Sequence, residues 1–503
     1  MWPYWESTIK AVTTPQYTRP VGPAVSLSAS LLATFKVFFT ATLLQLIVEQ
    51  TNAYARLLMG EEKYAKWVPV TEDEILAFLG LSILMGINKL PALRDYWRKD
   101  PVYHYSPVAS RISRDRYTDI LRYLHFVDNS TLPPRTSPSY DKLCRIRPVI
   151  DFVCAACKSA FNPGVYQSID EAMIPFKGRS CLKQYMPLKP TKRGIKVWVR
   201  SDSATGYVCE FEVYTGRQGS TVEVGLGGNV VRRLSREMIG SNCQLVMDNF
   251  FTSVPLFSSL LSDNIFACGT FRSHRKYFPA DMLSAAKVGL PKRGDFVQRQ
   301  TGKLVMTVWQ DTKPVAVLST NCDPTVVTEV KRKQKDGSQT TVQCPLSVRV
   351  YNKYMGGVDR ADQYRGCYTV RAKSRKCYRY VFWFLLEICI FNTYILHHYS
   401  PSASKPLTEY KDFRVALANE LIGSYCGRKS IGRPPKTTVP ARALTVAHFP
   451  VKTTRGRCHY CQVVHQRQAH TVWYCQQCEH RLCHTGHSDS DCFLQYHMEK
   501  GLL

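Results

Sequence analysis

SIDEAMIPFKGR, residues 168–179, is the segment from which the fold and the chemistry of this chain can be inferred. Two segments of similar character follow it, QLVMDNFFTS at 244–253 and YNKYMGGVDRADQ at 351–363. Together the three segments supply Asp170, Asp248, Asp359 and Asp362. Hard cations such as Mg²⁺ or Mn²⁺ bind carboxylate oxygens, and a two-metal site uses them to activate one oxygen and to stabilise another. Three acidic segments far apart in the sequence therefore predict a divalent-metal site that cuts or joins nucleic acid.

The composition favours a polyanionic partner. The chain of 503 residues carries a formal charge of +28, and Lys and Arg neutralise phosphates in non-specific binding. The length allows roughly two to four domains. The start, MWPYWE, lacks a basic segment followed by an apolar core, so no signal peptide is expected. The apolar stretch 380–396 contains Glu387, Asn392 and Thr393, which predicts a buried helix and no membrane partner.

The first third of the chain is predicted to be helical. Apolar residues recur at helical spacing within 35–58, 75–81, 117–124 and 146–161, and Thr71 and Ser113 are expected to cap the second and third of these helices. From residue 166 the pattern changes to alternation, with a hairpin expected at 196–200 and 208–214 and single strands at 244–247 and 265–270.

This order of elements places the acidic residues. Asp170 lies on or just after a strand, Asp248 lies at the end of one, and the spacing of Asp359 and Asp362 puts both on one face of a helix. Glu171 is a weaker candidate, because neighbouring residues on a strand point to opposite faces. A β-β-β-α-β-α core with acids on two strands and a later helix is the ribonuclease H-like (RNase H-like) layout.

We therefore predict a multidomain α+β protein. The expected parts are a disordered N-terminus (1–30), the first part of a helical DNA-binding and dimerisation domain (31–165), an RNase H-like catalytic domain (166–366) with a β-rich insertion at about 271–344, the second part of the helical domain (367–426), a basic linker (427–456) and a Cys-rich zinc cross-brace domain (457–503).

The C-terminal cysteines and histidines predict two zinc ions. Tetrahedral Zn²⁺ takes four Cys or His ligands, and interleaved pairs form a cross-brace that stabilises a segment too short for its own core. One ion is expected on Cys458, Cys461, Cys483 and His487, and the other on Cys475, Cys478, Cys492 and His497. His484, and then His480 or His465, are alternative histidine ligands. Cross-braces also occur in ubiquitin ligases and histone readers, so zinc binding alone does not define a function.

The three acidic segments, in this order, resemble the piggyBac transposase family and its genome-domesticated relatives. Further similarity lies at 38–52, 74–97, 123–126 and 183–190, so that the resemblance covers nearly the whole chain. It implies an RNase H-like transposase that nicks DNA at element ends, excises through hairpin intermediates and inserts at TTAA. It also implies a nuclear homodimer. By segment matching, Asp170, Asp248 and Asp359 would form the catalytic triad and Asp362 an accessory carboxylate.

Basic residues near the acidic segments are the candidate DNA contacts, because phosphate-positioning groups surround a nuclease site. GRP at 432–434 also resembles the core of an AT-hook, although a nuclear localisation signal or basic linker explains it equally well. A domesticated nuclear DNA-binding or chromatin protein is the alternative function. The candidate contacts are Lys177, Arg179, Lys183, Lys189, Lys192, Arg193, Lys196, Arg365, Arg371, Lys373, Arg375 and Arg433.

Overall fold

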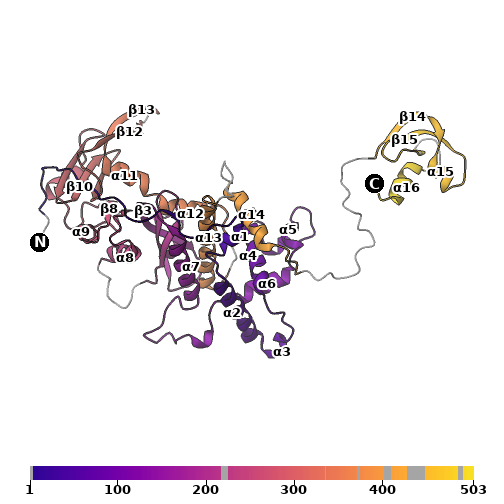
Figure 1. Ribbon diagram of the computed structural model, residues 1–503, viewed down its shortest axis with the longest axis horizontal. Coiled ribbons are helices and arrows are strands. Elements are labelled where there is room, and N and C mark those ends of the chain that lie inside the picture. Colours follow the sequence, from indigo (N-terminus) through magenta and orange to yellow (C-terminus); the bar gives the residue numbers. More distant parts are fainter. Residues whose placement is uncertain are drawn as a thin grey trace. The chain divides into compact units, whose positions relative to one another are not determined.

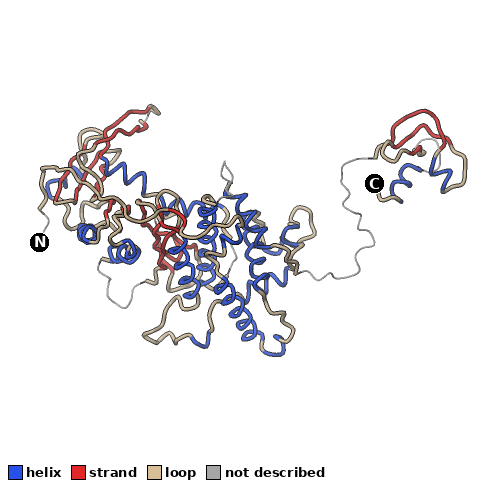
Figure 2. The backbone as a smooth tube through the Cα atoms, viewed as in Figure 1, coloured by secondary structure: helices blue, strands red, loops and turns tan. Residues whose placement is uncertain are grey.

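The computed structural model describes residues 4–187, 189–216, 225–334, 336–370, 374–400, 409–427, 448–484 and 491–502. The chain divides into two compact units, Met1–Gly427 and Arg428–Leu503, and each is described by itself (Figure 1). The larger unit contains a long mixed sheet and many helices, and the smaller one contains a short sheet and short helices (Figure 2).

The central sheet of the larger unit has the order β4-β5-β3-β7-β8-β11-β10-β9, with β6 also paired to β5. β7 pairs in parallel with both β3 and β8, whereas β3 and β5 are antiparallel. The order β6-β5-β3-β7-β8 is the RNase H-like arrangement expected from the sequence. The strands are β3 (Tyr166–Pro175), β4 (Lys183–Tyr185), β5 (Arg193–Asp202), β6 (Val208–Val213), β7 (Gln244–Met247), β8 (Phe266–Thr270), β9 (Phe296–Thr301), β10 (Leu304–Gln310) and β11 (Pro314–Ser319).

Strands at the centre of this sheet are buried on both faces. On β5, Val197 and Val199 belong to the core formed with the helices of one face, whereas Trp198 belongs to the core of the opposite face. Successive side chains of a strand point to opposite faces, so alternation here separates two cores. This explains why nearly every position of β5 is buried although its sequence alternates.

The first face is covered by helices from two distant parts of the chain. Thr71 and Ser113 cap α4 and α6 as predicted, because their hydroxyls accept hydrogen bonds from the N–H groups of Glu74 and Arg116. α14 packs along α4, and α13 packs against α1 and α7. The helices are α1 (Leu31–Phe35), α2 (Ala41–Met59), α3 (Glu61–Tyr64), α4 (Glu72–Ile87), α5 (Ser106–Ala109), α6 (Arg114–Tyr123), α7 (Arg147–Ala160), α12 (Gly357–Cys367), α13 (Cys377–His397) and α14 (Tyr410–Ile422).

α13 is the buried helix predicted at 380–396. It is long and apolar enough to cross a membrane, but 89% of its most apolar 18-residue stretch is buried inside the unit. Glu387 of α13 forms a buried ion pair with Arg414 of α14, with 2.6 Å between Oε2 and Nη1. Glu387 also accepts the N–H of Val370, and Arg414 donates to the carbonyl of Tyr368. These contacts join α13, α14 and the segment that leaves α12.

The second face is covered by the helices that follow β6, β7 and β8. They enclose a core around Trp198, Phe251 and Phe257. A separate hairpin, β12 (Val327–Lys333) and β13 (Gln339–Pro345), precedes α11. The remaining helices of the unit are α8 (Leu226–Leu234), α9 (Val254–Ser262), α10 (Leu283–Lys287), α11 (Leu346–Tyr354) and the short 3₁₀ turns Leu93–Trp97, Asn129–Thr131, Arg236–Met238 and Ala280–Met282.

One prediction about the larger unit needs correction. Disorder over 1–30 is wrong for residues 4–30: Glu6 bridges to Gln300 of β9, and β1 (Gly22–Pro23) pairs with β2 (Phe161–Asn162). Sheet edges offer backbone partners to an extended segment whatever its side chains are. The predicted β-rich insertion at about 271–344 extends the central sheet, because β11 pairs with β8.

The smaller unit is built around its cysteines. Its sheet has the order β14-β15-β16, and its core consists of cysteines packed with Tyr460, Leu482 and Phe493. So few apolar residues bury little surface, as expected for a segment that depends on metal ions. The elements are β14 (Pro450–Arg457), α15 (His459–Val463), β15 (His470–Cys475), β16 (His480–Arg481) and α16 (Cys492–Glu499).

The contact between α4 and α14 can be tested at Gly80. A Cβ atom at Gly80 would lie 2.6 Å from the carbonyl oxygen of Ala418 and 2.9 Å from Ile422 Cγ1. We expect Gly80→Ala to lower the free energy of unfolding by about 1–3 kcal/mol, because the helices must move apart. Gly366→Ala is the matched control, since a Cβ atom there meets nothing within 4 Å. Equal denaturation midpoints for the two variants would contradict the packing.

Candidate active site

Asp170 and Asp248 are brought together by the pairing of β3 with β7. Ser168 pairs with Val246 and Ile169 with Met247, so the next position in register joins the two aspartates. The Asp248 carboxylate accepts the N–H of Phe250 at 2.9 Å, which fixes it in the turn after β7. Asp170 Oδ1 accepts the N–H of Glu171 at 2.7 Å. The carboxylates of Asp170 and Asp248, each held by a backbone N–H group, therefore lie side by side at the point where β7 ends and β3 continues.

The Glu171 carboxylate lies close to these aspartates, although alternation along β3 predicts that its side chain points to the opposite face. One carboxylate oxygen from each of Asp170, Glu171 and Asp248 lies within 4.8 Å of the others. Alternation along β3 sends the Cα–Cβ bonds of Asp170 and Glu171 to opposite faces. The Asp170 side chain folds back onto the N–H of Glu171, however, and the longer Glu171 side chain reaches the same end of the sheet. Side-chain length, which a pattern of alternation ignores, explains why Glu171 lies near the aspartates.

Burial disfavours the ionised forms of Asp170 and Asp248. It raises the pKa of Asp170 to about 7, and the charges of Glu171 and Asp248 act in the same direction while Lys189 opposes them. Burial also raises the pKa of Asp248, against the hydrogen bond from Phe250. Crowded carboxylates of this kind bind a divalent cation well, because the cation offsets both the repulsion and the lost hydration.

Asp359 and Asp362 occupy α12, the helix predicted for them. Gly357 lets α12 approach β3, since a Cβ atom at that position would lie 2.4 Å from the hydroxyl oxygen of Ser168. Asp359 is exposed in the first turn of α12 and interacts electrostatically with Lys189. Its carboxylate is not among the three clustered within 4.8 Å. Asp362 is ion-paired with Arg365, so its accessory role stays a prediction.

The predicted DNA contacts fall into three groups. Lys177, Arg179, Lys192, Arg193 and Arg375 are exposed, and Lys183 and Lys189 are half-buried. Lys196 and Arg365 are buried, with Lys196 over the ring of Trp198 and Arg365 over that of Phe384, so neither is an open contact for DNA. Strand β5 and helix α12 turn these two side chains inward. Arg371, Lys373 and Arg433 lie outside the described residues.

The C-terminal unit brings its predicted ligands into two clusters. One contains Cys458, Cys461, Cys483 and Cys492, and the other contains His448, Cys475, Cys478 and His497. The Cys461 and Cys492 sulfurs are 3.4 Å apart, and His497 Nε2 is 3.3 Å from Cys475 Sγ. Tetrahedral sites with metal–sulfur bonds of about 2.3 Å place ligand atoms about 3.8 Å apart, so both clusters fit zinc. His497 Nδ1 donates to the carbonyl of Phe493, which turns Nε2 toward the cysteines.

The predicted grouping of these ligands is wrong at Cys492. Cys492 and His497 both lie on α16, and five residues correspond to a rotation of about 140° around a helix axis. The two side chains therefore face different clusters. The fourth residue of the second cluster is His448, which was predicted to lie in the basic linker. His487 lies outside the described residues, and Cys492 occupies the place expected for it.

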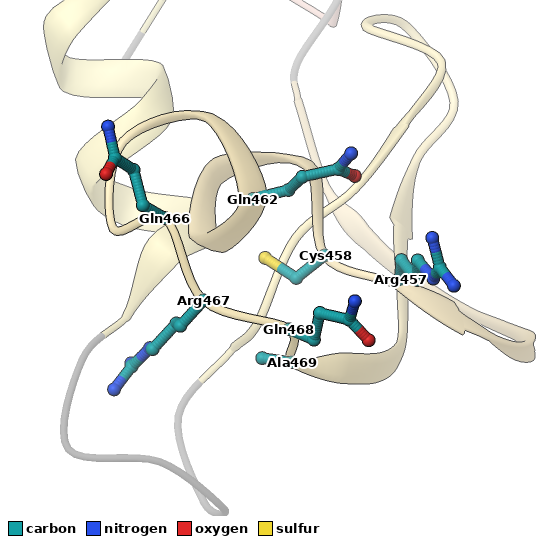
Figure 3. Close-up of a pocket in the computed structure, with 7 residues that line it drawn as sticks. All are labelled: Arg457, Cys458, Gln462, Gln466, Arg467, Gln468 and Ala469. Atoms are coloured by element: carbon teal, nitrogen blue, oxygen red, sulfur yellow. The ribbon is translucent and has the colours of Figure 1, made fainter.

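A polar hollow lies beside the first cysteine cluster of the C-terminal unit (Figure 3). Among the described residues, it is lined by side chains that bear guanidinium and amide groups and by no carboxylate. It therefore lacks the groups that characterise the aspartate cluster of the larger unit. The lining residues are Arg457, Cys458, Gln462, Gln466, Arg467, Gln468 and Ala469.

Comparison with known proteins identifies the family. A family model described as Transposase IS4 matches residues 32–394. The chain is 29% identical over 472 residues to human PiggyBac transposable element-derived protein 3, covering 92% of this chain and 75% of the relative. Its structure resembles a piggyBac transposase synaptic complex with hairpin DNA, with a TM-score of 0.69, 25% identity, and coverage of 92% of this chain and 98% of the other. The chain belongs to the piggyBac transposase family.

A second human relative extends this result. PiggyBac transposable element-derived protein 5 is 27% identical over 437 residues, covering 83% of this chain and 81% of the relative. The family resemblance inferred from the acidic segments is therefore confirmed, as is the combination of an RNase H-like core with flanking helices.

The raised pKa of Asp170 predicts a pH-dependent stability. A carboxyl group whose pKa is about 7 in the folded protein, against an ordinary value of 3.8, destabilises the fold as pH rises between these values. Asp170→Asn should therefore raise the melting temperature at pH 8 by several degrees without metal, and by much less at pH 4.5. Scanning calorimetry with EDTA would check this, and equal shifts at both pH values would contradict it.

The zinc clusters predict distinct stoichiometries. His448→Ala should lower the bound zinc from about two ions per chain to about one, because the second cluster loses a ligand. His465→Ala is the matched control, since His465 is exposed and lies outside both clusters. Atomic absorption of the dialysed full-length protein would measure the zinc content. Unchanged zinc in His448→Ala would remove His448 from the ligands.

Proposed function

We propose that this protein is a DNA transposase with a divalent-metal site on Asp170, Asp248 and Asp359. The observation that carries the proposal is the meeting of Asp170 and Asp248 at paired strands of an RNase H-like sheet. Helix α12 packs on the same strand, β3, and brings Asp359 to this part of the unit. Membership of a transposase family supports the same reaction class.

The substrate proposed for this chain is DNA. The solved structure that it resembles is a piggyBac transposase in a synaptic complex with hairpin DNA. By analogy, we propose hairpin-mediated excision, insertion at TTAA, and a homodimer that holds two DNA ends. The charge of +28 and the exposed basic residues between β3 and β5 favour contact with phosphates. A protein with this substrate is proposed to act in the nucleus.

The chain's own groups prepare the site for phosphate chemistry. Asp170, Asp248 and Asp359 would hold Mg²⁺ or Mn²⁺, which supplies Lewis-acid activation and charge stabilisation when bound. Backbone hydrogen bonds from Phe250 and Glu171 hold the half-buried Asp248 carboxylate and the buried Asp170 carboxylate before substrate arrives. Such preorganisation lowers the cost of orienting the reacting groups. The nucleophile would be water in nicking and a 3′ hydroxyl in joining, so no side-chain nucleophile is needed.

The C-terminal unit is proposed to bind two zinc ions and to contact DNA. Its two clusters offer two complete sets of Cys and His ligands. Basic residues stand on β14, which ends at Arg457, and next to the first cluster at Arg467.

The alternative is a domesticated DNA-binding or chromatin protein that no longer transposes. The two human relatives are named as transposable element-derived proteins, which favours this alternative. The presence of all four aspartates favours retained catalysis, because a protein that only binds DNA does not need them.

A nicking assay with the purified full-length protein tests the proposal. The substrate is duplex DNA from the sequence flanking its own coding region, with an adjoining TTAA, and the expected result is Mg²⁺-dependent nicking and strand transfer. Asp248→Asn should lower the rate by about a thousandfold or more while binding of the duplex is retained. Binding without cleavage by the wild type would favour the domesticated alternative. Equal cleavage by Asp248→Asn would exclude the proposed site.

A further inference from the structure

Glu171 lies between two lysines beside the catalytic aspartates. Its Oε1 is 3.4 Å from Lys189 Nζ, and its Oε2 is 3.7 Å from Lys196 Nζ. Lys189 Nζ is also 4.0 Å from Asp170 Oδ1. The Glu171 side chain is 8% exposed, and Oε2 has no hydrogen-bond partner. Each oxygen of this buried carboxylate therefore faces a cation.

These neighbours make Glu171 a poor metal ligand despite its position. A divalent cation on either oxygen would stand close to an ammonium group, and like charges at a buried site repel strongly. The carboxylate of Asp248 has no lysine in an ion pair with it among the described residues, and Asp170 meets only Lys189 at the 4.0 Å limit. Metal binding is therefore favoured on the aspartates, with Glu171 as the counterion of the lysines.

The two lysines differ in what they can reach. Lys196 is 8% exposed, and its ammonium lies 3.8 Å from the ring centre of Trp198 and 4.8 Å from that of Phe250. Lys189 is 31% exposed and stands on the loop before β5, where the N–H of Met186 donates to the carbonyl of Lys192. An ammonium group has three N–H donors, and of the two carboxylates paired with Lys189, Glu171 is the nearer. Lys189 can therefore bind a further anion, whereas Lys196 cannot.

We propose that Glu171 is a positioning residue rather than a metal ligand, and that it holds Lys189 where its ammonium binds a non-bridging oxygen of the phosphodiester under attack. The proposal rests on the proposed function, because it places a phosphodiester at the aspartates. Lys189 then stabilises the negative charge that accumulates on the phosphate oxygens in the transition state. Lys196 fixes the other oxygen of Glu171 and so keeps this arrangement rigid.

The role of Glu171 can be tested by Mn²⁺ binding to the full-length protein, measured by electron paramagnetic resonance of free Mn²⁺. Glu171→Gln should retain a saturable Mn²⁺ site with an affinity within about tenfold of the wild type, as expected for a group that contacts no metal. Asp170→Asn and Asp248→Asn should lose this site. Lys189→Met should bind Mn²⁺ more tightly, because a nearby positive charge has been removed. Loss of the site in Glu171→Gln would overturn the proposal.

The role of Lys189 can be tested by cleavage of the flanking duplex at saturating Mn²⁺. Lys189→Met should lower kcat by about a hundredfold with KM nearly unchanged, the result of losing one transition-state contact. Lys189→Arg should recover most of the rate, and Glu171→Gln should resemble Lys189→Met. Lys287→Met, the same change at an exposed lysine of α10, is the control for a general loss of basic charge.

The outcomes separate this inference from the proposed function. Equal kcat values for Lys189→Met and wild type would exclude the phosphate contact while leaving the transposase proposal intact. A parallel rise in KM for Lys189→Met and Lys287→Met would reduce Lys189 to a general DNA contact and would also overturn the inference. Absence of cleavage by the wild type would remove the proposed function and the phosphate contact together, and the Mn²⁺ titration would still decide whether Glu171 is a ligand.

Discussion

The pairing of β3 with two different partners is the constraint on which the larger unit depends. One edge of β3 pairs in antiparallel register with β5, and the other pairs in parallel with β7. The first pairing brings the loop with Lys189 over Asp170, and the second brings Asp248 beside it. Because side chains alternate between the two faces of a sheet, a shift of either pairing by one residue would point the acidic side chains into an apolar core. The cores on both faces of the sheet thus fix the geometry of the site.

Much of this arrangement can be predicted from the sequence, because the local signals are strong. Thr71 and Ser113 are helix caps that act within the first turn of each helix, and the alternation at 196–200 and 208–214 indicates a hairpin directly. The order of acidic segments is sufficient to identify the family. The sequence does not predict that residues 4–30 are structured, because their partners are distant: Glu6 pairs with Gln300, on a strand far along the chain.

The details of the sites escape prediction for a different reason. Strand alternation does not predict that Glu171 lies beside the aspartates. The sequence alone presents Lys196 as a surface cation, whereas β5 places it against Trp198. In the C-terminal unit, Cys-x2-Cys spacing identifies four ligands, but the assignment of Cys492 depends on the rotation of α16 and that of His448 on the path of the chain before β14. Spacing in the sequence therefore identifies which residues are zinc ligands. The helices and strands that carry these residues decide which of the two clusters each ligand joins.

The packing of α4 against α14 has a consequence for how the chain is synthesised. α4 is buried on nearly all sides, and the helix that covers it begins at Tyr410, more than three hundred residues later. The buried pair of Glu387 and Arg414 also forms only when that late helix is present. On the ribosome, an apolar helix would thus wait without its partner while the whole catalytic sheet is made. The first helical part of this protein therefore exposes apolar surface until the last helices of the unit are made, and such exposed surface favours aggregation.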